Sequence, residues 1–179
     1  MPTLSALRLP LPWDEFSLPN PLLTRSTVLM TGEIGWGWDG GAPAFSIPPV
    51  NPVEGTAVEG WDLDHVVLLV PNIDTAVDRM VEAGTSPRLR MHVGGRPAAF
   101  FRVGPLLEVI QSPVRESVIY GVALATDESL EAVALRWRSL GREVGDPHPA
   151  VQPGRRIMTV RATEIGFAVM SPDRATSAD

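Results

Sequence analysis

The chain has 179 residues, a formal net charge of −6, 44% hydrophobic residues and no cysteine. This length suits one domain or two small halves that share a core, and the missing thiols exclude disulfides and thiolate metal sites. The negative charge disfavours nucleic acid and anionic membranes as partners, and no apolar stretch reaches the roughly 18 residues of a membrane span. Pro10 and Pro12 interrupt the apolar stretch near the N-terminus, so we expect a cytoplasmic protein without a secretory signal.

Residues 1–60 contain nine of the 18 prolines and seven of the 16 glycines, which excludes a long helix through most of this segment. The segment is also richer in aromatic residues than a flexible linker, since it holds Trp13, Trp36 and Trp38. We therefore predict an extended N-terminal arm whose tryptophans pack on the main body or on a partner subunit. Simple disorder is the alternative.

The pattern becomes regular from residue 61. Residues 63–70 form an apolar run that predicts a buried strand, with His65 as its one imidazole. Residues 72–83 have apolar positions at helical spacing, with Asn72 placed to cap the helix and Gly84 to end it. Strands are predicted over residues 88–93, 97–103 and 106–111. Residues 61–113 thus form a βαβββ module.

The same order recurs over residues 117–172. A strand over 118–125 precedes a helix over 128–140, and further strands are predicted at 142–144, 156–161 and 165–170. Residues 65–69 align with 121–125, and residues 108–113 align with 167–172. We expect the arginine-rich turn at 154–156 to be solvated, and residues 173–179 to form a solvated tail.

The segments Leu63-Asp64-His65-Val66, Asn72-x-x-x-Ala76 and Leu107-Glu108-Val109-Ile110, together with the repeat, resemble the glyoxalase/bleomycin-resistance/extradiol-dioxygenase group, the vicinal oxygen chelate superfamily. The resemblance covers about residues 63–172. It implies an α+β fold in which two βαβββ modules, with curled mixed sheets, pair around a cleft. The modules pair within one chain or by swapping between chains, and a homodimer is expected.

Members of this superfamily typically bind a divalent metal through one ligand on the first strand and one on the fourth strand of each module. The resemblance therefore assigns His65 and Glu108 as metal ligands and catalytic residues of module one. In module two the matching positions are Gly121 and Phe167, which cannot bind a metal. A third ligand for Fe, Mn, Ni, Co or Zn would come from His92, from the arm, or from module one of a second chain.

Two functions remain open. The first is a glyoxalase-like protein that holds a small organic molecule in the cleft without a complete metal site, with Gly121, Phe167 and His92 lining the cleft. The alternative is a metal-dependent lyase, isomerase or dioxygenase-type enzyme that uses His65 and Glu108 on a substrate with vicinal oxygens. A structural role is also open, in which His65 and Glu108 only pair with each other.

Overall fold

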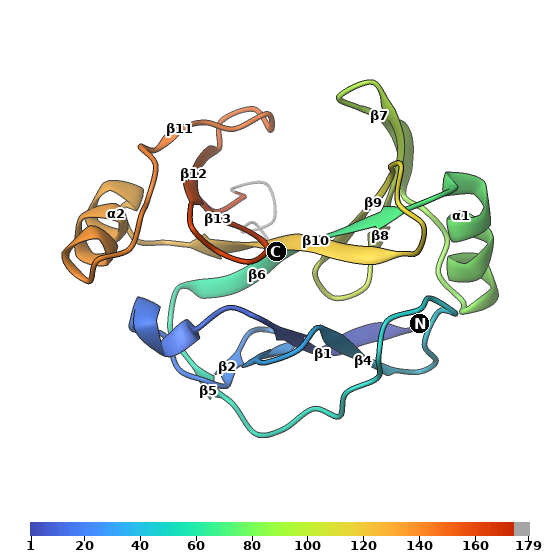
Figure 1. Cartoon of the computed structure of the whole chain (residues 1–179), viewed down its shortest axis with the longest axis horizontal. Coiled ribbons are helices and arrows are strands. Elements are labelled where there is room, and N and C mark those ends of the chain that lie inside the picture. The colour runs from blue at the N-terminus through green and yellow to red at the C-terminus, as the bar shows by residue number, and fades with distance from the viewer. Residues whose placement is uncertain (174–179) are drawn as a thin grey trace.

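The computed structural model describes residues 1–173, and this part of the chain forms two β-sheets and two α-helices (Figure 1). The larger sheet has the strand order β11-β12-β13-β10-β6-β9-β8-β7. Its strands are β6 (Trp61–Val70), β7 (Leu89–Val93), β8 (Arg96–Arg102), β9 (Leu106–Gln111), β10 (Val118–Thr126), β11 (His148–Pro149), β12 (Arg156–Val160) and β13 (Gly166–Met170). The helices α1 (Ile73–Glu82) and α2 (Leu130–Ser139) follow the first strand of each module.

The larger sheet is built from two βαβββ modules in one chain, as the sequence predicts. The first strands of the modules, β6 and β10, run antiparallel side by side at its centre. Each pairs in parallel with the last strand of its own module, β9 and β13 respectively. The modules therefore join within one chain into a single mixed sheet.

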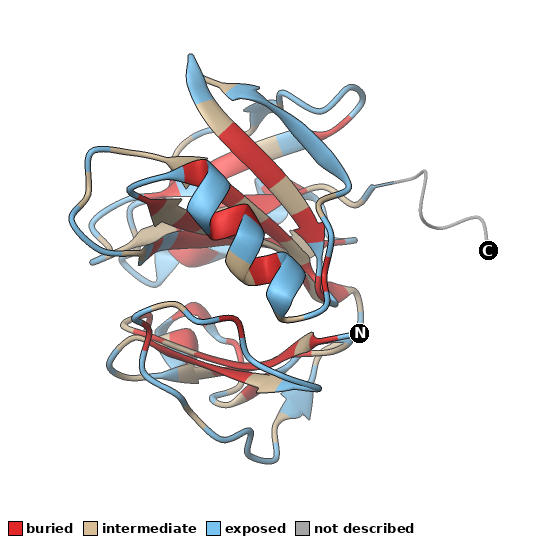
Figure 2. Ribbon diagram, turned by 90° about the vertical axis from the view of Figure 1, so that its right-hand side faces the viewer, coloured by how far each residue is buried: buried red, intermediate tan, exposed pale blue. Residues whose placement is uncertain are grey.

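Both helices bury one face against this sheet. In α1 the side chain of Asn72 accepts a hydrogen bond from the backbone N–H of Thr75 at 2.9 Å, which caps the first turn. In α2 the cap is Ser129, which accepts from the backbone N–H of Ala132 at 3.3 Å. In both helices the residues that point toward the sheet are buried, and Figure 2 shows buried and exposed positions alternating along α1. Neither helix is long and apolar enough to cross a membrane, and no other helix in the described residues is.

The larger sheet is strongly curved. Its outer strands β7 and β12 rise on one side of the central pair, which leaves a concave face (Figure 1). The helices and the N-terminal part of the chain lie on the convex side. The outer strands thus border the concave face on both sides.

The N-terminal segment differs from the extended arm that its proline content predicts. It forms a second sheet with the order β4-β1-β3-β2-β5. Its strands are β1 (Thr3–Leu9), β2 (Leu22–Leu23), β3 (Val28–Thr31), β4 (Gly35–Asp39) and β5 (Thr56–Ala57). The strands are short enough that every proline of this segment falls outside them, so the ladder loses no backbone donor.

Aromatic side chains of the second sheet and its connections close the core beneath the larger sheet. The ring of Trp13 lies 5.5 Å from that of Phe167, and the ring of Phe16 lies 4.8 Å from that of Trp137. The indole N–H of Trp137 donates to the carbonyl oxygen of Phe16 at 2.9 Å. Leu4, one of several fully buried leucines in β1, adds to the same core. The N-terminal segment therefore packs on the main body of its own chain.

Candidate functional site

The register of the central strands decides which side chains reach the concave face. Cross-strand partners point to the same side of a sheet. His65 is the partner of Leu106 and of Ala123, whereas Val67 is the partner of Glu108 and of Gly121. Their neighbours Val66 and Val122 are buried on the convex side. His65 and Glu108 therefore share the concave face, on adjacent strands.

A β-bulge places Asp64 beside the ring of His65. Leu63 pairs with Leu124 and His65 pairs with Ala123, so Asp64 is the extra residue between them. Successive residues of a regular strand point to opposite faces. The bulge removes this restriction, and Nδ1 of His65 lies 2.8 Å from Oδ2 of Asp64.

Asp64 is held from its other side by Arg155, which comes from module two. Nη2 of Arg155 donates to Oδ1 of Asp64 at 2.5 Å, and the same guanidinium donates twice to the carbonyl oxygen of Ser171. Only 9% of the Arg155 side chain is exposed. The expectation of a fully solvated turn at 154–156 is thus wrong for Arg155, because the buried carboxylate of Asp64 requires a positive partner.

The ion pair of Arg155 and Asp64 determines which ring nitrogen of His65 carries a proton. Burial opposes the charge on Asp64, but hydrogen bonds from His65 and Arg155 and their positive charges outweigh it, so the pKa of Asp64 lies below its usual 3.8. An ionised carboxylate only accepts hydrogen bonds. Nδ1 of His65 therefore carries a proton, and Nε2 is the ring nitrogen left for a ligand. No hydrogen bond to Nε2 is formed within the described residues.

Glu108 lies close enough to His65 for their charges to interact. Burial raises the pKa of Glu108 above its usual 4.5, and the positive charge of His65 acts against this rise. The described residues provide no hydrogen bond between the two side chains. A simple hydrogen-bonded pair, the structural role considered above, is therefore not what the geometry shows.

The counterpart of Glu108 in module two is Ala168 rather than Phe167. Glu108 is the cross-strand partner of Val67, which lies two residues after His65. Ala168 is the cross-strand partner of Ala123, which lies two residues after Gly121. Phe167 points to the convex side, where it is 2% exposed and packs against Trp13. The expectation that Phe167 lines the cleft is thus wrong, because a shift of one residue turns a strand side chain to the other face.

His92 also faces away from His65. Its neighbour Arg90, two residues earlier on β7 and hence on the same face, forms an ion pair with Asp74 of α1 on the convex side. His92 itself is exposed. The structure therefore removes His92 from the set of cleft residues and from the candidate metal ligands.

The residues present do not fit the four-ligand metal site that the resemblance implies. The positions in module two are Gly121 and Ala168, and neither has a donor atom in its side chain. Asp64 is already engaged by Arg155 and His65. Among the described residues no three His, Asp or Glu side chains come together in a group that suits a metal ion.

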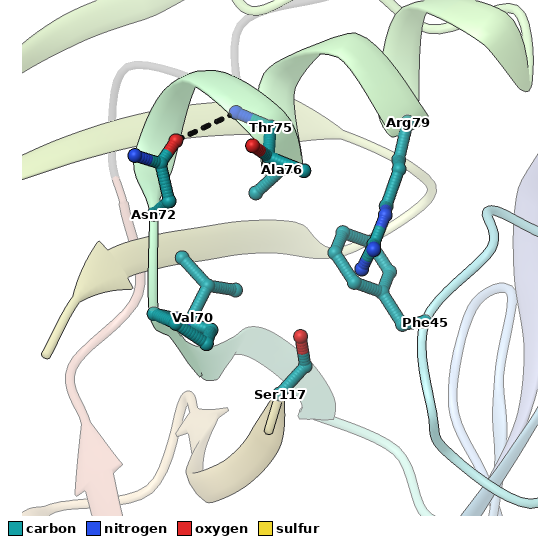
Figure 3. Close-up of a pocket in the computed structure, with 8 residues that line it drawn as sticks. Phe45, Val70, Asn72, Thr75, Ala76, Arg79 and Ser117 are labelled. Atoms are coloured by element: carbon teal, nitrogen blue, oxygen red, sulfur yellow. Dashed lines mark hydrogen bonds between the residues drawn. The ribbon is translucent and has the colours of Figure 1, made fainter. Parts of the chain in front are cut away.

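Two pockets lie outside the row of His65 and Glu108. The larger, of about 720 Å³, is at the end of the central strands where β6 begins and β10 ends, and Asp64 and Arg155 form part of its wall. The smaller, of about 240 Å³, lies beside the first turn of α1, where the guanidinium of Arg79 stacks 5.7 Å from the ring of Phe45 (Figure 3). The larger pocket is thus the one that adjoins the buried ion pair.

No protein-family model matches the sequence, and no curated protein sequence matches it. Solved structures do. Methylmalonyl-CoA epimerase from Mycobacterium tuberculosis matches with a TM-score of 0.52 and 19% identity over 68% of this chain and 93% of the epimerase. The hypothetical protein BH1468 from Bacillus halodurans C-125 matches with a TM-score of 0.51 and 16% identity over 64% and 96% of the respective chains.

A further methylmalonyl-CoA epimerase matches with a TM-score of 0.51 and 15% identity, over 63% of this chain and 95% of the epimerase. At these identities the likeness concerns the fold. The chain shares the fold of these proteins, with the two βαβββ modules that the sequence resemblance implies. The resemblance seen in the sequence is confirmed at that level.

Proposed function

We propose that this protein binds a small organic molecule on the concave face of its larger sheet, with His65 and Glu108 as the polar groups that contact it. The observation that carries the proposal is a series of hydrogen-bonded side chains, Arg155, Asp64 and His65, which connects module two to module one. Burying two charges is costly unless each is paired. A series of this kind that presents a ring nitrogen at an open face is more typical of a binding or catalytic site than of a packing contact.

The residues around His65 on the concave face are small or apolar. On β10 and β13 the concave positions are occupied by small residues, namely Gly121, Ala123, Gly166 and Ala168. Beside them Val67, Leu69 and Ile110 supply a half-buried apolar floor. A mainly apolar surface with a few convergent polar groups suits a small organic ligand.

The metal-dependent lyase or isomerase is kept as a second candidate because of one contact. Histidines that bind metals commonly donate their other ring N–H to a carboxylate, as His65 does to Asp64. His65 and Glu108 would then be two protein ligands, with water, substrate or a second chain supplying the rest. The fold neighbours include epimerases, and an isomerase reaction is in line with this candidate.

Isothermal titration of the full chain with methylmalonyl-CoA and with a panel of small carboxylic and aromatic acids tests both candidates. We expect at least one compound to bind, and His65→Ala to weaken it by about tenfold or more because a charged or polar hydrogen bond is lost. His148→Ala is the matched control, since His148 is exposed on β11. Unchanged affinity in His65→Ala would reject the proposed site.

Metal analysis of protein purified from metal-replete medium separates the two candidates. A stoichiometric divalent metal that disappears in both His65→Ala and Glu108→Gln would favour the enzyme. Ligand binding that persists after chelation would favour the metal-independent binding protein. A cytoplasmic homodimer remains part of the proposal, and light scattering coupled to size exclusion measures its mass.

A further inference from the structure

We infer that the pocket of about 720 Å³ beside this site takes the anionic end of an organic acid, and that Arg102 is the cation that binds it. The inference rests on the proposed function, because it names the chemical class of the molecule held at His65. Three arginines lie in the wall of this pocket, namely Arg25, Arg102 and Arg155.

Arg102 lies on the same face as His65. It is the cross-strand partner of Leu106, and Leu106 is in turn the partner of His65 on the next strand. The three residues therefore form one row across β8, β9 and β6. Neighbouring strands are about 4.8 Å apart, so the backbones of Arg102 and His65 lie about 10 Å apart. A ligand of modest length can reach both side chains.

The other two arginines of the pocket already have partners. Arg25 pairs with Asp62, with 3.5 Å between Nε and Oδ2, and Arg155 pairs with Asp64. Arg102 forms no ion pair or side-chain hydrogen bond within the described residues, although it lines the pocket wall. It is thus the cation of this wall whose charge is available to a ligand.

The remaining acidic residues of the pocket lie far from Arg102 along the sheet. Asp127 follows β10 and Asp173 follows β13, which are three and four strands away from β8. At about 4.8 Å per strand, Asp127 is on the order of 14 Å away along the sheet. At that separation water and salt screen most of the interaction between exposed charges.

The apolar residues near Arg102 and His65 indicate that the middle part of the ligand is apolar. Leu106 separates Arg102 from His65, and Phe100, two residues before Arg102, faces the same side next to Glu108. An acid with a carboxylate at one end, an apolar middle and a polar group at the other end matches this order of side chains. The volume of the pocket suits a molecule of that size.

Isothermal titration with matched acid and amide pairs tests the inference on the full chain. The probes are 4-hydroxyphenylacetate, 4-(4-hydroxyphenyl)butyrate and 6-(4-hydroxyphenyl)hexanoate, each compared with its uncharged amide. We expect wild type to bind an acid about tenfold more tightly than its amide. In Arg102→Gln this preference disappears, while the affinity for the amide stays the same. Arg115→Gln makes the same charge change on an exposed loop and retains the preference.

The outcomes separate this inference from the proposed function. An acid preference that survives in Arg102→Gln overturns the inference, as does the failure of every acid to bind. If acid and amide bind equally but both are lost in His65→Ala, the binding site stands and the anion pocket does not. If the preference depends on Arg102 while His65→Ala changes nothing, the anion pocket stands and the role of His65 falls. Thermal unfolding of each variant checks that it is folded.

Discussion

Asp64 gives the site its geometry through one inserted residue. Without the bulge its carboxylate would point to the opposite side of β6 from His65. With the bulge it accepts from the ring of His65 and pairs with Arg155. Removing either charge of this ion pair leaves the other one buried without its partner.

Asp64→Asn should destabilise the protein at neutral pH by about 3–5 kcal/mol, because Arg155 loses its buried counter-charge. The effect depends on pH. The pKa of Asp64 is lower in the folded protein than its usual 3.8, so its ionised form stabilises the fold above that value. This contribution is lost as the pH falls through the folded-state pKa.

Chemical denaturation between about pH 7 and pH 3 measures the effect. Wild type and Asp64→Asn should differ most at neutral pH and converge on acidification. Asp127→Asn, at an exposed carboxylate after β10, is the control. A constant difference across the whole range would contradict the assignment of the stabilisation to ionised Asp64.

At the scale of elements, the sequence predicts what depends on local pattern. Helix α1 begins after Asn72 as expected, because capping and apolar spacing are encoded within a dozen residues. The repeat of βαβββ order is likewise visible. The face of each strand residue is harder to predict, since it depends on loop lengths and bulges that do not appear as a local pattern. For this reason the sequence favours Phe167 over Ala168 as the cleft residue and predicts a solvated Arg155.

Substitutions at two successive positions of β13 should separate packing from binding. Phe167→Ala removes a ring from the convex core and should cost about 3–5 kcal/mol of stability, with ligand affinity of the folded protein unchanged. Ala168→Leu adds bulk on the concave face and should weaken ligand binding, with a smaller effect on stability.

Thermal unfolding and titration with the same ligand measure both variants. The sign of the comparison is the test: if Phe167→Ala reduced affinity and Ala168→Leu did not, the concave face would have been assigned to the wrong set of β13 residues. Thr159→Ser, next to Ala168 on β12, is a mild control on the same face.

At the scale of the whole molecule, the N-terminal sheet is part of the core. Sequence composition gave little sign of this, because prolines dominate the segment and its strands are as short as two residues. The tryptophans were the informative signal. Trp13 packs against Phe167, and the backbone of Phe16 accepts the indole N–H of Trp137. The convex side of the larger sheet therefore depends on residues from both sheets.

A fragment of residues 61–179 should not fold into a stable native state. Each large apolar side chain that loses its cover costs about 1.5–3 kcal/mol, and several such residues together exceed the 5–15 kcal/mol that stabilises a typical domain. Near-ultraviolet circular dichroism and binding of a hydrophobic dye report the loss of packing. The full chain, treated in parallel, is the control. A cooperative unfolding transition of the fragment, with native near-ultraviolet signal, would contradict this expectation.

The unequal halves of the concave face have a consequence for the orientation of a bound molecule. A duplicated module related by a pseudo-twofold axis offers a ligand two equivalent orientations. Here one half presents His65 and Glu108, and the other presents Gly121 and Ala168. A molecule with two different ends therefore meets two different surroundings and is held in one orientation only. Loss of symmetry between the modules therefore fixes which end of a ligand meets His65 and Glu108.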